Sequence, residues 1–174
     1  MKIAITGTPG CGKTTVAEKV ADKTSMDYVS INHLAREKDC IISYDEERGS
    51  DIVDIKALRE ETEELDDCIL DGHLSHFMEN DMVFVLRCKP SVLKERLEEK
   101  GWEEDKINEN VEAEIVGVIE GEARNSNDEV YSIDTTDRDI EEVVNTITEI
   151  IDGESGEEYS DHFDWIEQGE VDNI

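Results

Sequence analysis

A glycine-rich segment near the start of the chain constrains the fold most. Residues 7–14 read Gly-Thr-Pro-Gly-Cys-Gly-Lys-Thr and match the pattern G-x-x-x-x-G-K-[ST]. A short apolar run, residues 2–6, precedes the segment, and apolar residues recur at helical spacing over residues 13–23 after it. Strand, glycine turn and helix in this order predict a phosphate-binding loop, because glycines let backbone N–H groups surround phosphate oxygens at the positive end of a helix. A chance glycine turn before a helix is the alternative that this context disfavours.

The motif predicts both a nucleotide and a metal. Lys13 should reach the β- and γ-phosphates of ATP, and the Thr14 hydroxyl should ligate Mg²⁺. The residues expected to bind the nucleotide at this loop are Pro9, Gly10, Cys11, Gly12, Lys13, Thr14 and Thr15.

A second metal ligand is expected at the end of an apolar strand beside the first. Asp71 closes the run Cys-Ile-Leu-Asp and has this placement, although an ordinary helix cap or loop acid is the alternative interpretation. His73 follows two residues later, at the edge of the sheet where ligands of such folds bind. His33, His76 and His162 have no comparable context and are interpreted as surface or packing residues.

The few arginines are candidates for the cations that phosphoryl transfer needs around the migrating charge. Arg36, on a helix after the second strand, is a candidate for the acceptor phosphate. Arg96 and Lys100 flank Gly101-Trp102, where a short lid could begin, and Arg124 could reach in from the following helix. Pairing with glutamate on a solvated helix face explains each of them equally well.

The order of apolar runs predicts an α/β fold. Five runs have strand character, at residues 2–6, 28–31, 68–70, 82–86 and 130–133, and helical patterns cover residues 13–23, 56–65, 91–100, 106 to about 124, and 140–151. This alternation predicts a parallel sheet with helices on both faces. Residues 1–151 are expected to form one domain, followed by an acidic C-terminal extension over residues 152–174. Phe163, Trp165 and Ile166 could dock on the domain or on a partner, and a frayed tail is the alternative.

Charge and cysteine content restrict the partners and the setting. With 47 acidic and 17 basic residues the net charge is -30, which disfavours direct binding of nucleic acid. Self-repulsion of this size is screened in molar salt, where the Debye length is about 3 Å, so the composition indicates a halophilic organism. Four widely spaced cysteines indicate no disulfide framework and a reducing cytoplasm, and no segment has the length of a signal peptide or membrane span.

Several motifs together resemble the adenylate kinase isoenzyme 6 family, whose archaeal and eukaryotic members are small nucleoside monophosphate kinases that also serve small-subunit ribosome maturation. The resemblance runs from Met1 to about Trp165. It rests on the phosphate loop, Leu-Asp-Gly-His at 70–73, Leu-Lys-Glu-Arg-Leu at 93–97 with Lys-Gly-Trp at 100–102, Asn-Val-Glu-Ala-Glu-Ile at 110–115, and Ile-Asp-Thr-Thr at 133–136.

The resemblance implies a P-loop NTPase three-layer sandwich like that of nucleoside monophosphate kinases, with a five-stranded parallel sheet ordered 2-3-1-4-5. It implies an acceptor-binding segment over about residues 31–65, a lid at about 100–108, a Walker-B-type role for Asp71 and a catalytic role for His73. Two positions depart from the pattern. Lys100 stands where related sequences more often carry arginine, and Leu74-Ser75 stands where ordinary adenylate kinases carry a Pro-Arg pair.

These features predict a Mg²⁺-dependent transfer of the ATP γ-phosphate to AMP, giving two ADP, with water as a possible second acceptor. Lys13, Asp71, His73 and Arg96 are the predicted catalytic residues, Arg96 and Arg124 complete the ATP site, and Arg36 binds AMP. The rival hypothesis is an assembly factor that binds a basic small-subunit ribosomal protein and uses ATP turnover as a switch. A GTPase is disfavoured because no N-K-x-D motif occurs.

Overall fold

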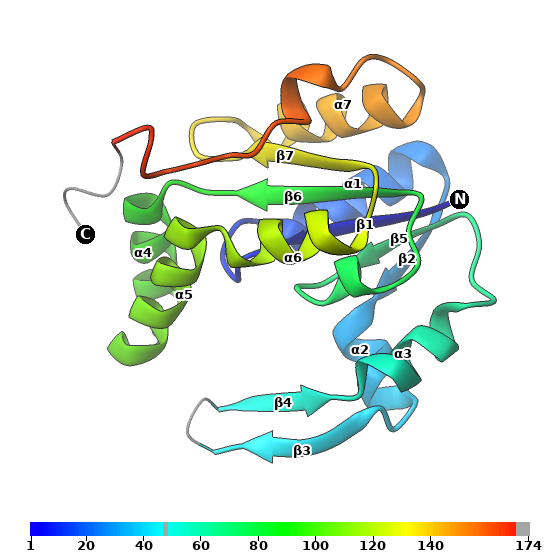
Figure 1. The fold of residues 1–174 in the computed structure, drawn as a ribbon, viewed down its shortest axis with the longest axis horizontal. Helices are drawn as coiled ribbons and strands as arrows, with labels where there is room; N and C mark the ends of the chain where they lie inside the picture. The colour runs from blue at the N-terminus through cyan, green and yellow to red at the C-terminus, as the bar shows by residue number, and fades with distance from the viewer. Residues whose placement is uncertain (47–48, 170–174) are drawn as a thin grey trace.

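The structure, a computed structural model, describes residues 1–46 and 49–169 (Figure 1). Five parallel strands form its central sheet in the order β2-β5-β1-β6-β7. They are β1 (Lys2–Gly7), β2 (Asp27–Ser30), β5 (Cys68–Asp71), β6 (Met82–Arg87) and β7 (Val130–Asp134). Numbered among themselves, these strands have the order 2-3-1-4-5, so the predicted topology is confirmed.

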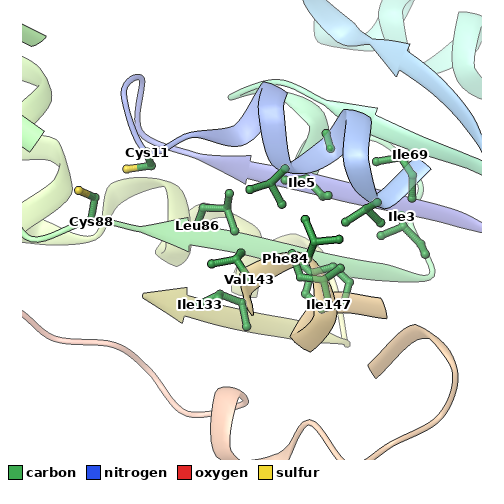
Figure 2. Packing of buried hydrophobic residues seen from close by; sticks show 14 of the residues in the cluster. Ile3, Ile5, Cys11, Ile69, Phe84, Leu86, Cys88, Ile133, Val143 and Ile147 are labelled. Carbon is green, nitrogen blue, oxygen red and sulfur yellow. The ribbon is translucent and has the colours of Figure 1, made fainter. Parts of the chain in front are cut away.

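Helices cover both faces of the sheet, because alternate residues of each buried strand point to opposite faces. Ile3 and Ile5 of β1 pack with Phe84 and Ile133 against α1 (Lys13–Thr24) and α7 (Ile140–Ile151), as Figure 2 shows. The intervening Ala4 faces the other side of the sheet. There it packs with Val83 and Val85 of β6 and with Ala123 of α6 (Val118–Ser126). The result is the three-layer sandwich that the sequence predicted.

Two helix predictions need correction at their boundaries. The single helix expected over residues 106–124 is divided into α5 (Glu104–Val116) and α6, because Gly117 adopts a left-handed φ of 70° that ends one helix and begins the next. The helix expected over residues 91–100 is α4 (Pro90–Glu99), whose proline occupies the first turn, where its missing N–H costs nothing.

The segment between β2 and β5 contains a feature that the sequence analysis missed. After α2 (Ile31–Glu37), β3 (Ile41–Asp45) and β4 (Ser50–Val53) form a separate antiparallel hairpin, followed by α3 (Ile55–Thr62). The helices pack through Ile31, Ala35 and Leu58 against Leu70 of the sheet. β3 begins with the apolar pair Ile41 and Ile42, which the sequence analysis did not recognise as a strand. Both hairpin strands are short, and Ile42 and Tyr44 are exposed.

The chain returns to the domain after α7. Trp165 is 2% exposed, and Gly156 lies so close to Tyr131 that an added Cβ would approach its ring within 2.5 Å. The segment is therefore anchored on the domain at Gly156 and Trp165, and most of its other residues are exposed. Of the three residues expected to dock, Trp165 is buried and Phe163 is half-buried, whereas Ile166 is exposed. Residues 170–174 lie outside the described part. Among the described residues, no helix has the length and apolarity needed to cross a membrane.

Candidate active site

The phosphate loop connects β1 to α1 with backbone conformations that only glycine readily adopts. Gly7 has a φ of 137°, and an added Cβ would lie 2.3 Å from the Leu86 carbonyl oxygen. Gly12 stands directly before α1 with a φ of 88°. Within the described residues, no side-chain cap and no acid in the first turn occupies this end of α1. Its free N–H groups and positive dipole therefore remain available to an anion.

Lys13 lies across the loop that precedes it. Its Nζ donates a hydrogen bond to the Thr8 carbonyl oxygen over 3.1 Å. Desolvation lowers the pKa of Lys13, and Lys100 lowers it further, while Cys11 and Asp71 act in the opposite direction. The ammonium group is thus held half-buried at the loop, where bound phosphates would stabilise its charge.

Asp71 joins the loop to the end of β5, because β5 lies beside β1 in the sheet. Its Oδ2 accepts hydrogen bonds from the Thr14 hydroxyl (2.9 Å) and from the Tyr28 hydroxyl (2.8 Å). Its Oδ1 is buried and has no hydrogen-bond partner within the described part of the chain.

A buried carboxylate oxygen without a partner is costly unless a cation neutralises it. Oxygen ligands from a carboxylate and a hydroxyl are those that Mg²⁺ prefers, usually together with phosphate oxygens and waters. Thr14 and Asp71 therefore fit a magnesium ion on the donor set they present, with Asp71 Oδ1 as the free position.

The two neighbouring histidines have different environments. His73 follows Asp71 and is exposed, and desolvation together with the charge of Lys13 lowers its pKa. His76 is fully buried, shares a hydrogen bond between Nδ1 and the Thr6 hydroxyl (3.0 Å), and has its pKa lowered to about 4 by burial. His76 is thus a packing residue, while His73 is exposed and lies close enough to Lys13 for the lysine charge to affect its pKa.

A cavity of about 210 Å³ adjoins the loop, and Asp71 is not among its lining residues. Arg96 of α4, one of the predicted site residues, lies at this cavity. The complete lining is Gly10, Cys11, Gly12, Thr15, Val16, Arg96, Thr135, Arg138, Ile140 and Val143. The lining combines two arginines with the aliphatic side chains of Val16, Ile140 and Val143, a mixed apolar and cationic surface of the kind that small-molecule sites present.

The sequence analysis missed Thr135, Arg138, Ile140 and Val143 as site residues. The Thr135 hydroxyl donates to the Cys11 carbonyl oxygen (3.3 Å), which ties the end of β7 to the loop. The run Ile-Asp-Thr-Thr at 133–136 marked this place in the sequence, but nothing in it indicated a ligand. Topology supplies that information, because β7 ends at the same edge of the sheet as β1.

The side chain of Cys11 is directed to a second thiol. Its sulfur lies beside that of Cys88, and both side chains are buried (Figure 2). The hydrogen bond from Cys11, with Arg96 Nη1 at 3.3 Å from the Cys88 sulfur, lowers the pKa of Cys88. Cys11 therefore contributes only its backbone to a ligand at the loop.

The structure does not bring Arg124 to the phosphate loop, which corrects the prediction that it completes the ATP site. Its guanidinium donates to Glu120 Oε1 (3.0 Å), the Ser132 hydroxyl (3.1 Å) and the carbonyl oxygens of Ser160 and Asp161. The side chain is used in holding the C-terminal segment. This role could not be predicted from the sequence, because Ser160 and Asp161 lie 36 and 37 positions after Arg124 in the chain.

Arg36 lies on α2 and forms an exposed ion pair with Asp51 of β4, with 3.1 Å from Nε and 3.0 Å from Nη2 to Oδ2. It belongs to the predicted acceptor-binding segment. In this arrangement an anion that uses Arg36 has to replace the carboxylate of Asp51.

A strand, phosphate loop and helix beside a strand-end aspartate define a P-loop nucleotide-binding enzyme. Residues 3–117 match the family model described as "AAA domain". A protein of Archaeoglobus fulgidus described as "Putative adenylate kinase" is 43% identical over 88% of this chain and 84% of its own length. A protein of Pyrococcus furiosus with the same description is 46% identical over 87% and 84%. The chain belongs to the same family as these archaeal proteins, a family of P-loop kinases.

Solved structures agree on the fold. Shikimate kinase from Acinetobacter baumannii, in complex with shikimate, superposes with a TM-score of 0.63 over 86% of this chain and 92% of its own. The two sequences are only 16% identical, so this likeness concerns the arrangement of helices and strands alone.

Proposed function

We propose that this protein is a magnesium-dependent adenylate kinase of the isoenzyme 6 type. It transfers the γ-phosphoryl group of ATP to a phosphate oxygen of AMP and gives two ADP, without a covalent enzyme intermediate. The proposal depends mainly on the contact between the phosphate loop and the end of β5. There the Thr14 hydroxyl donates to Asp71 Oδ2, and Asp71 Oδ1 has no hydrogen-bond partner among the described residues. The charge of Asp71 also acts on Lys13.

The phosphates and the adenine of the donor nucleotide occupy two neighbouring places, the phosphate loop and the adjoining cavity. The phosphates lie on the loop amides and Lys13. The adenine enters the neighbouring cavity, whose lining includes Arg96, Arg138, Val16 and Ile140. Bound at Thr14 and Asp71, Mg²⁺ would neutralise charge on the phosphate oxygens. In this proposal Arg96 contacts ATP, and Arg124 does not.

The acceptor lies on the segment that carries α2, the hairpin and α3. Arg36 offers a guanidinium for the AMP phosphate once Asp51 is displaced. The lid covers about residues 100–108, and Gly101 near its start has a left-handed φ of 72°. Lys100, the first residue of the lid, lies close enough to Lys13 to lower the pKa of Lys13. Lys106, in the first turn of α5, has its ammonium group 4.8 Å from the centre of the Trp102 ring, a cation–π contact within the lid segment.

Turnover with different acceptors tests the proposal. ATP is supplied with AMP, with each other nucleoside monophosphate, and with none, and ADP formation is followed. Fast AMP-dependent production of ADP supports the adenylate kinase. Slow hydrolysis that needs no acceptor, and is stimulated by a basic small-subunit ribosomal protein, would indicate instead the ATP-dependent assembly switch.

Substitution of His73 by alanine is expected to lower turnover by about ten- to a thousandfold and to change ATP affinity only a few-fold. Because the pKa of His73 is below its usual value, the imidazole is neutral near pH 7 and can orient the acceptor as a hydrogen-bond partner. Protonation on acidification should therefore cause an acid limb in kcat, with a midpoint below about 6.5, that disappears in His73→Ala.

His33→Ala is the matched control for this measurement, since His33 is exposed on α2 and, within residues 1–46 and 49–169, its ring pairs with Glu37 of the same helix alone. His76 is unsuitable because it is buried. Equal losses at His73 and His33, or an acid limb that persists in His73→Ala, would contradict the role assigned to His73.

We also propose that the protein works in a salt-rich cytoplasm. Its net charge of -30 is spread over the domain, and the resulting repulsion is screened only by concentrated salt. Circular dichroism and turnover across a potassium chloride series should show folding and activity rising from low millimolar to molar salt. Equal folding and activity at both ends of the series would contradict this proposal.

A further inference from the structure

Glu114 of α5 is the most highly coordinated carboxylate near the phosphate loop, although the predicted reaction assigns it no role. It is 2% exposed. Its Oε1 accepts hydrogen bonds from Arg87 Nε (2.8 Å), the Cys88 backbone N–H (3.1 Å) and the Trp165 indole N–H (3.0 Å). Its Oε2 accepts a hydrogen bond from the hydroxyl of Thr8, within the phosphate loop.

Neighbouring charges keep this buried carboxylate compensated. Arg87 also donates to Glu120 and, over 2.7 Å, to the carbonyl oxygen of Glu114, and Arg124 donates to Glu120 from the other side. Burial raises the pKa of Glu120, but hydrogen bonds from Ser132 and the Phe163 N–H, together with Arg87, lower it overall. Two carboxylates face two guanidinium groups, so the cluster is charge-balanced and can hold one defined geometry.

The C-terminal segment completes this cluster. The chain after α7 runs back toward α4 and α5 (Figure 1), where the Phe163 carbonyl oxygen accepts from Arg87 Nη1 over 2.9 Å. Trp165 then places its indole N–H on Glu114. A tryptophan buried in this way contributes a large apolar contact area and one directed donor.

Thr8 connects the cluster to the nucleotide site through its two oxygen atoms. Its hydroxyl is bound by Glu114, and its carbonyl oxygen is the acceptor for Lys13 Nζ at 3.1 Å. A continuous chain of contacts therefore leads from Trp165 to Glu114, to Thr8 and to Lys13. A hydrogen bond from a hydroxyl to a carboxylate is stronger than one to a neutral oxygen. Glu114 therefore holds the loop more firmly than a neutral acceptor would.

We propose that Glu114 is a positioning residue for the phosphate loop, acting through Thr8 on Lys13, and that the C-terminal segment belongs to the functional site through Trp165. The catalytic part of this proposal rests on the proposed function, whereas its effect on ATP binding does not. Glu114 touches no substrate. It holds the loop in the conformation in which the amides and Lys13 meet the phosphates.

Variants of Thr8 test the link most directly. Thr8→Val keeps the shape of the side chain and removes the hydroxyl donor, while Thr8→Ser retains it. We expect Thr8→Val to raise the Kd for ATP with Mg²⁺, measured by calorimetry, about tenfold and to lower kcat by a similar factor. Thr8→Ser should restore most of both. Thr148→Val is the control, because Thr148 is a buried threonine on α7 whose hydroxyl, among the described residues, binds the Asn145 carbonyl oxygen and no other group.

A double-mutant cycle then assigns the effect to Glu114. Glu114→Gln removes the charged acceptor, because the donors on Oε1 require the amide oxygen there and leave the NH2 group facing the Thr8 hydroxyl. This variant should raise the Kd for ATP as Thr8→Val does, and the double variant should be little worse than either single one, because both changes act on the contact between Glu114 and Thr8. Arg87 keeps Glu120 as a partner in Glu114→Gln. Trp165→Phe, which removes only the indole donor and some volume, should raise the Kd about threefold.

Several outcomes would overturn the proposal. They are additive effects in the cycle, a Thr8→Ser variant as weak as Thr8→Val, and losses of thermal stability in the Thr8 and Trp165 variants with kcat and the Kd for ATP unchanged. If Glu114→Gln does not fold, the comparison of Thr8→Val, Thr8→Ser and Trp165→Phe still decides the question. Absence of AMP-dependent turnover in the unsubstituted protein would contradict the proposed function instead, and the calorimetric Kd values would still test Glu114.

Discussion

Replacement of Lys13 by methionine is expected to reduce turnover about a thousandfold or more. The ammonium group lies at the loop, and the charge that develops between the β- and γ-phosphates needs a cation placed there in advance. Methionine keeps the aliphatic length and removes the charge, so the loss measures several kcal/mol of transition-state stabilisation. Steady-state formation of ADP at saturating ATP, with circular dichroism to verify folding, provides the measurement.

Lys19→Met is the matched control. Lys19 lies on the same helix, α1, but its ammonium group is exposed and pairs with Glu141 of α7. Surface ion pairs of this kind contribute about 1 kcal/mol or less, so turnover should stay within twofold of the unsubstituted protein. Near-normal turnover in a folded Lys13→Met variant would mean that the loop does not bind the reacting phosphates.

Those parts of the site that lie in continuous sequence could be predicted from the sequence. The loop at 7–14 carries its chemistry in eight adjacent residues, and Asp71 was identified because a charged residue ends a buried apolar run. The strand order followed from the resemblance. In the structure Thr14 and Asp71 lie 2.9 Å apart across 57 positions of sequence, as parallel pairing of β1 with β5 requires.

The remaining parts depend on which helix face meets which neighbour, and a single sequence does not contain that information. Arg124 and Arg96 both read as cations on acidic helices. The structure places Arg96, on α4, at the cavity. Arg124 lies on α6, after the turn at Gly117, and binds Glu120 of the same helix. An isolated glycine is tolerated inside helices, so the sequence pattern continued through it.

The buried ion cluster was missed for a related reason. Glu114 is one acid among 47, and in the sequence it looks like another solvated residue of an acidic helix. Its partner Arg87 ends β6 and Trp165 belongs to the extension, so the three meet only after the sheet and the C-terminal segment are in place. In a chain of this charge, the informative acids are those with buried cationic partners, and only the fold reveals them.

Replacement of Asp71 by asparagine is the second change with a large expected effect. Asparagine preserves the volume, and its amide oxygen can still accept hydrogen bonds from Thr14 and Tyr28. It removes the negative charge and places an NH2 group where Oδ1 now lies without a partner. If Oδ1 serves the metal, turnover should fall by about a hundredfold or more, and the Mg²⁺ concentration for half-maximal activity should rise about tenfold or more.

Tyr28→Phe separates the charge of Asp71 from its hydrogen bonds. This variant removes the 2.8 Å bond from the Tyr28 hydroxyl to Oδ2 and leaves the carboxylate and the Thr14 contact intact. It should lower turnover only a few-fold, as expected for loss of one supporting hydrogen bond, and should leave the magnesium dependence unchanged. A magnesium titration of both variants decides between the two roles. An Asp71→Asn variant that needs no more Mg²⁺ than the unsubstituted protein would show that Asp71 braces Thr14 without serving the metal.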